Sequence, residues 1–82
     1  MAKWTVDAFD DVRHAWDYIA ERITAVAALL DAHPLMGRRG QEPKTREFVV
    51  SGTPYIVIYR LVGDEPEILR VLHGKQSWPP RG

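Results

Sequence analysis

Six charged side chains in the second half of the chain could together act on a phosphodiester. Cleavage of RNA through its own 2′-hydroxyl needs a base, an acid for the leaving 5′-oxygen, and cations that stabilise the developing phosphorane charge. A histidine can fill either proton-transfer role because its ordinary pKa is about 6.5, a glutamate can be the base, and arginines can hold the anionic oxygens. The candidates all lie in or beside predicted strands: Arg46, Glu47, Arg60, Arg70, His73 and Lys75.

A catalytic set drawn from these residues is chemically sufficient but not specific. Each residue also has a structural interpretation: Arg60 and Glu47 could pair across adjacent strands, as opposite charges often do. His73 could be a hydrogen-bonded structural histidine at a strand end. Arg70 has aliphatic neighbours and needs a partner for its charge, so it could anchor to an acid on a helix. The set that a nuclease would use is Arg46, Glu47, Arg70 and His73.

The elements that must position these residues are three strands rich in Val, Ile and Tyr. Glycine-containing turns at residues 52–53 and 63–64 predict antiparallel hairpins. Both faces of the sheet would be largely apolar, so the face away from the helix should be a partner or binding surface. The strands are predicted at residues 46–51, 54–62 and 66–74, with a short edge strand at 3–6.

Before the strands, residues 7–33 contain no Gly, Pro or Asn, and their large apolar side chains recur every three or four residues. This spacing predicts one continuous amphipathic helix. Such a helix would be roughly 35–40 Å long, whereas an eight-residue strand spans roughly 27 Å. We therefore expect the excess apolar stripe to contact a second copy of the chain.

Composition restricts the class of protein. The 82 residues form a single domain, 1–82, with a net charge of zero, but residues 1–33 hold three basic and six acidic groups and the remainder eight and five. The chain contains no cysteine, its three histidines are far apart in sequence, and no apolar run approaches the ~20 residues of a membrane span. We expect a cytoplasmic protein with no metal, no cofactor and no membrane partner.

The order of several segments resembles the RelE/ParE superfamily of toxins from type II toxin–antitoxin systems, especially its ParE-like or plasmid-stabilisation branch. The segments are HPLMGRRG, TREFVV, GTPYIVIYR and ILRVLHG, preceded by AFDDVRHAWDYIAE. The resemblance implies an α+β fold with helices on an antiparallel sheet, here of three or four strands, and an antitoxin partner. Family members usually have two helices that form a hairpin. The predicted continuous helix therefore implies that these two helices are fused here. For a chain with such a fused helix we hypothesise a domain-swapped homodimer.

The resemblance also implies two alternative activities. ParE-like members poison DNA gyrase, and RelE-like members are metal-independent endoribonucleases that cut mRNA on the ribosome. Ribonuclease members carry an arginine in the strand position that Ile56 occupies here, which favours gyrase as the target. The third alternative is an inactive relative that only dimerises or binds an antitoxin. The expected partner-binding residues are Arg60, Arg70, His73, Lys75 and Trp78.

Overall fold

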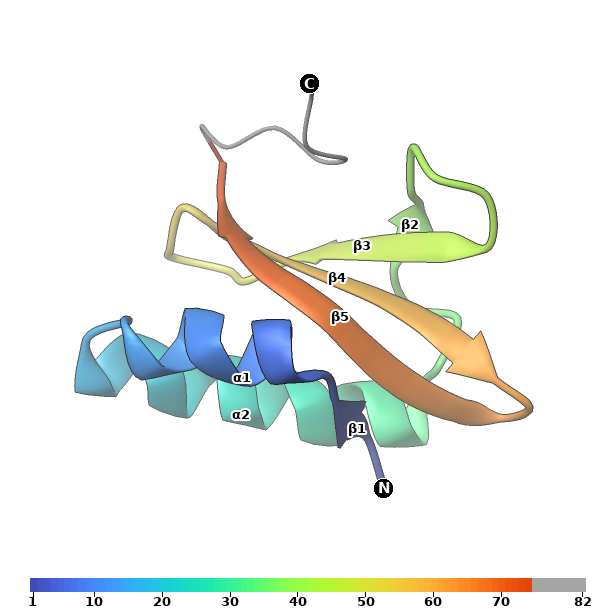
Figure 1. The fold of residues 1–82 in the computed structure, drawn as a ribbon, viewed down its shortest axis with the longest axis horizontal. Coiled ribbons are helices and arrows are strands. Elements are labelled where there is room, and N and C mark those ends of the chain that lie inside the picture. The colour runs from blue at the N-terminus through green and yellow to red at the C-terminus, as the bar shows by residue number, and fades with distance from the viewer. Residues whose placement is uncertain (75–82) are drawn as a thin grey trace.

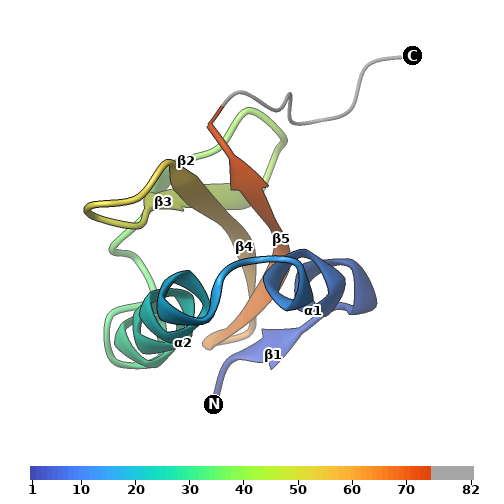
Figure 2. The ribbon, with the colours of Figure 1, turned by 90° about the vertical axis from the view of Figure 1, so that its left-hand side faces the viewer.

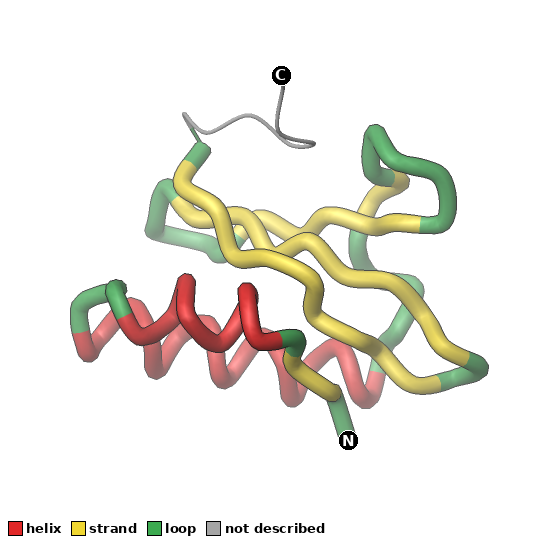
Figure 3. The backbone as a smooth tube through the Cα atoms, in the orientation of Figure 1, coloured by secondary structure: helices red, strands yellow, loops and turns green. Residues whose placement is uncertain are grey.

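The protein is described by a computed structural model, in which residues 1–74 are placed and form a layer of two helices against a five-stranded sheet (Figure 1). Both helices lie on one face of the sheet, and the other face carries no helix in this part of the chain (Figure 3). None of the described helices is both long and apolar enough to cross a lipid bilayer. The elements are β1 (Lys3–Trp4), α1 (Val6–Arg13), α2 (Asp17–Ala32), β2 (Arg38–Arg39), β3 (Thr45–Val49), β4 (Tyr55–Val62) and β5 (Glu65–His73).

The sheet has the strand order β1-β5-β4-β3-β2. The three long strands and the edge strand near Lys3 are confirmed within a few residues, and the turns contain Gly52 and Gly63 at positive φ. The prediction of a three- to four-stranded antiparallel sheet was wrong in two respects. The two-residue strand β2 pairs with β3, and β1 runs parallel to β5, so the sheet is five-stranded and mixed.

The prediction of one continuous helix was also wrong. The chain leaves α1 after Arg13, and Trp16 has an extended backbone (φ −63°, ψ 151°) before α2 begins at Asp17. The side chains that completed the predicted stripe across this break are exposed, Phe9 by 60% and Trp16 by 72%. The helical hairpin is therefore present, and the domain-swapped dimer loses its geometric basis.

An unbroken helix would be longer than the folded molecule. Residues 7–33 as one helix would be about 40 Å long, but the longest extent of the molecule is 31 Å. Two shorter helices can instead both pack on the same sheet, as the end-on view shows (Figure 2). Their buried side chains meet Val57, Tyr59, Ile68 and Val71 of the sheet, and α2 contributes Ile19, Ile23, Val26, Ala27 and Leu30.

A β-bulge in β5 changes which side chains share a face. Ile58 pairs with Arg70 and Tyr59 with Ile68, which leaves Leu69 as the extra residue. Simple alternation predicts Ile68 and Val71 on opposite faces, yet both pack in the core under the helices. The bulge therefore lets β5 bury both Ile68 and Val71, after which Leu72 lies on the helix-free face opposite Ile56 and His73 lies opposite Tyr55 on the helix side.

Candidate functional site

A small cleft on the helix-free face is the candidate site. By strand alternation, Ile56 and Ile58 point away from the core residues Val57 and Tyr59. The cleft has a volume of about 170 Å³ and combines these apolar walls with four polar residues. Its described lining is Arg38, Gln41, Glu47, Ile56, Ile58, Leu72, His73 and Gly74.

Glu47 occupies the polar side of this cleft and is held there by the neighbouring strand. Arg38 lies directly opposite Glu47 in the β2–β3 pairing. Its guanidinium donates to the Glu47 carboxylate over 3.2 Å, and the backbone N–H of Gln41 lies 3.4 Å from the other carboxylate oxygen. Glu47 is thus a fixed, charge-paired acceptor.

His73 reaches the same cleft from the end of β5. Tyr55 lies opposite it on β4, and the two rings meet edge to face with centroids 5.7 Å apart. Tyr55 shares the helix side of the sheet with Val57, so the imidazole lies on that side, whereas the Glu47 carboxylate opposite Ile58 lies on the helix-free side. The predicted acid–base pair is therefore separated by the sheet, although His73 contributes to the edge of the cleft.

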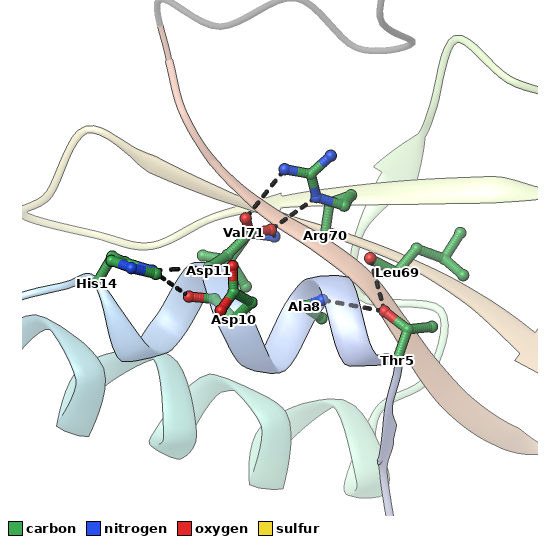
Figure 4. Close-up of polar contacts among 8 residues, drawn as sticks. All are labelled: Thr5, Ala8, Asp10, Asp11, His14, Leu69, Arg70 and Val71. Carbon is green, nitrogen blue, oxygen red and sulfur yellow. Dashed lines mark hydrogen bonds and ion pairs between the residues drawn. The ribbon is translucent and has the colours of Figure 1, made fainter.

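The two arginines of the predicted set lie elsewhere. Arg46 pairs with Tyr59 on the core side of β3, and its guanidinium donates to the backbone oxygens of Gly37 at 2.6 Å and Leu35 at 3.4 Å. Arg70 makes a two-pronged contact with Asp11 of α1, at 2.8 and 3.0 Å (Figure 4). Hydrogen bonds to the Asp11 carboxylate raise the pKa of Arg70 further above its ordinary value. The structural interpretation of Arg70, an anchor to a helical acid, is confirmed.

Arg60 has a different partner from the one suggested by the sequence. Glu47 lies opposite Ile58, whereas Arg60 lies between Thr45 and Glu67. Its guanidinium is 2.6 Å from the Glu67 carboxylate, so the suggested Arg60–Glu47 pair is wrong. Arg60 remains half-exposed at the far end of the sheet from His73. Lys75 and Trp78 lie outside the described residues.

Sequence reasoning missed Arg38 as a partner of Glu47. The segment PLMGRRGQEPKT shows no strand pattern, because two-residue strands are too short to show a periodic pattern. A signal does exist, because one glycine and one proline between Arg38 and Glu47 favour a hairpin that would place them opposite each other.

Comparisons with known proteins agree on the type of fold and on one family. A family model described as "ParE toxin of type II toxin-antitoxin system, parDE" matches residues 2–78. A protein of Sinorhizobium fredii named "Putative toxin Y4kP" is 44% identical over 70 residues, which span 85% of this chain and 71% of that protein.

Solved structures with a similar fold come from toxin–antitoxin systems. A chain of the chromosomal ParDE system from P. aeruginosa aligns with a TM-score of 0.76 and 23% identity, over 88% of this chain and 92% of that one. A chain of the E. coli RelBE complex aligns with a TM-score of 0.79 and 10% identity, over 93% and 98%. At these identities the structures show the fold alone, which is the α+β fold of the RelE/ParE superfamily.

Proposed function

The chain belongs to the ParE toxin family of type II toxin–antitoxin systems, since the family model spans residues 2–78, and from this we propose that it arrests bacterial growth by inhibiting DNA gyrase. We also propose that a cognate antitoxin neutralises it in the cytoplasm. The similar chains solved as parts of the ParDE and RelBE systems support a protein partner of this kind.

One observation favours a binding toxin over a nuclease. Among the described residues that line the cleft, Arg38 is the one arginine or lysine, and Glu47 already compensates its charge. Ile56 and Ile58 form the wall beside them. A phosphorane formed in such a cleft would meet no uncompensated cation from residues 1–74, and this stabilisation is usually the largest catalytic contribution.

The proposed contact with gyrase is the basic side of the sheet and the end of the chain. The proposed contact residues are Arg60, Arg70, His73, Lys75 and Trp78. Arg60 is the best placed of the described ones, because it is half-exposed beside a hollow of about 570 Å³ whose lining includes Lys44, Leu61 and Val62. Arginines in such mixed surfaces often contribute strongly to protein interfaces.

The test is the supercoiling of relaxed plasmid by purified gyrase in the presence of this protein. We expect the native chain to inhibit supercoiling. Arg60→Ala should need a roughly tenfold higher concentration for the same inhibition, as expected when an interface arginine contributes about 1.4 kcal/mol to the binding free energy. Arg13→Ala, which removes an exposed cation from the end of α1, is the matched control and should inhibit as the native chain does. Full supercoiling at all toxin concentrations would contradict the proposal.

A second candidate function is ribosome-dependent cleavage of mRNA. The observation that favours it is that β5 brings His73 to the edge of the cleft that holds the Glu47 carboxylate, with the imidazole beside Tyr55 on the helix side. Cleavage of a translated mRNA that disappears in both Glu47→Gln and His73→Ala, without any effect on gyrase, would select this function instead.

A further inference from the structure

The hairpin formed by β2 and β3 carries three cations that no carboxylate compensates. Within residues 1–74, Arg38 pairs with Glu47, but Arg39, Lys44 and Arg46 make no ion pair. Carbonyl oxygens hold the Arg46 guanidinium, and since they bear no formal charge, its positive charge stays uncompensated. This hairpin is therefore a local source of positive potential on a chain whose net charge is zero.

The pairing of the hairpin places two of these cations face to face. Arg39 lies directly opposite Arg46 in the β2–β3 register. Like charges at directly opposed positions destabilise a sheet, whereas an anion bound between them would relieve the repulsion. The Leu35 and Gly37 carbonyl oxygens give Arg46 a structural role but do not neutralise its charge, so an anionic ligand would still stabilise the opposed pair.

The loop between the strands holds the third cation close by. The backbone N–H of Gly40 donates to the Thr45 oxygen at 2.8 Å, and the Thr45 hydroxyl donates to the Glu42 oxygen at 2.6 Å. A side chain at position 40 would collide with Thr45, and Lys44 takes a positive φ of 65°, which is uncommon for a residue other than glycine. The loop is thus tightly closed and presents Lys44 beside the two arginines.

A hollow of about 450 Å³ connects the three cations. It is lined by Arg39, Gly40, Gln41, Glu42, Pro43, Lys44, Thr45 and Arg46. Glu42 is the one acid in this lining, so three positive charges outnumber one negative charge. The lining contains no aromatic ring on which an unpaired base could stack, as proteins that bind single strands commonly provide.

We propose that the β2–β3 hairpin binds the phosphodiester backbone of duplex DNA through Arg39, Lys44 and Arg46. Contacts of this kind position a protein on DNA and carry no sequence information. The helical segment 1–33 has three more acidic than basic groups, so the positive charge of the chain is concentrated in the part that contains the hairpin. The binding requires no gyrase, and it would place a ParE-family toxin on the DNA that its proposed target holds.

The test is the fluorescence anisotropy of a labelled short DNA duplex titrated with the purified protein at low salt, without gyrase. The native chain should bind with an affinity that falls as salt rises, with a slope of about −0.9 for each phosphate neutralised. The double variant Arg39→Glu/Lys44→Glu should bind at least tenfold more weakly, and Glu42→Gln should bind more tightly. The control is the double variant Lys3→Glu/Arg13→Glu, which changes the net charge by the same amount but lies outside the hairpin.

The outcomes separate binding from folding. Because Arg39→Glu places a carboxylate opposite Arg46, the hairpin variant should melt no earlier than the native chain. Equal weakening in the two charge-matched double variants, no binding at low salt, or tighter binding of single-stranded RNA than of the duplex would each overturn the proposal. Any of these results leaves the gyrase assay unaffected, since that assay measures enzyme inhibition.

Discussion

Replacing Asp11 by alanine is expected to lower the free energy of unfolding by about 2–3 kcal/mol, since hydrogen bonds to a charged group contribute about 1.5–3 kcal/mol each and this site is partly exposed. The Asp11 carboxylate accepts two hydrogen bonds from Arg70 and one of 2.8 Å from the backbone N–H of Val71. The side chains of Arg70 and Asp11 are 26% and 16% exposed, so solvent screens the remaining charge only in part.

The effect should be large because α1, and not another strand, contacts most of this edge of β5. Beyond the short pairing with β1, the edge of β5 meets α1, and side chains of this segment satisfy its backbone (Figure 4). Thr5 donates its hydroxyl to the Leu69 oxygen at 2.8 Å, and Asp11 takes the N–H of Val71. Loss of Asp11 therefore leaves both the Val71 N–H at the edge of β5 and the guanidinium of Arg70 without their hydrogen-bond acceptor.

Thermal unfolding followed by circular dichroism measures this effect. At about 4–8 °C for each kcal/mol in a domain of this size, the melting temperature should fall by roughly 10–20 °C. Asp10→Ala is the matched control, because the neighbouring Asp10 is exposed and makes only a 3.9 Å contact with His14. Equal melting temperatures for the two variants would show that the Asp11 contacts do not hold α1.

Replacing Tyr59 by phenylalanine is expected to cost about 2 kcal/mol, since a buried donor or acceptor left without its partner costs about 1–3 kcal/mol. The Tyr59 ring is fully buried, and its hydroxyl joins the sheet to the segment before β2. The hydroxyl donates to the Pro34 oxygen at 2.8 Å and accepts from the Gly37 N–H at 2.9 Å. The variant deprives both backbone groups of their partner.

Urea denaturation gives the corresponding free energy, and Tyr55→Phe is the matched control. Tyr55 is only partly buried, and its ring contacts His73 edge-on without needing the hydroxyl. We expect this control to change the unfolding free energy by less than about 0.5 kcal/mol, as for substitutions away from a buried network. If Tyr59→Phe were as stable as the control, the hydroxyl would have no part in fixing the segment that carries Arg38.

The strands could be predicted from sequence because their β-branched runs are long and their turns contain glycine. The break between the helices could not, because residues 13–17 contain neither Gly nor Pro, and the apolar spacing continues across them. An unbroken helix would exceed the 31 Å extent of the folded molecule, which is a tertiary property that no local pattern contains. The bulge at Leu69 could not be predicted either, because it becomes apparent only when β5 is aligned with β4.

The candidate site was predictable in part. The residue types singled out Glu47, whose carboxylate lies in the cleft, and the alternative of a helical acid for Arg70 identified its actual environment. The Arg60–Glu47 pair was mistaken because cross-strand pairing depends on register, and Arg38 was missed because a strand of two residues gives no register signal. The proposed gyrase contact and the nuclease set both remain predictions.

Growth of a bacterial culture after induced expression of this chain, alone and together with the product of the adjacent open reading frame, tests the central claim most directly. We predict arrest by the chain alone and relief by the neighbouring protein, because a ParE-family toxin is proposed to be held inactive by its antitoxin. Unaffected growth, with folded protein present in the lysate, would contradict the account and indicate a relative that has lost toxicity.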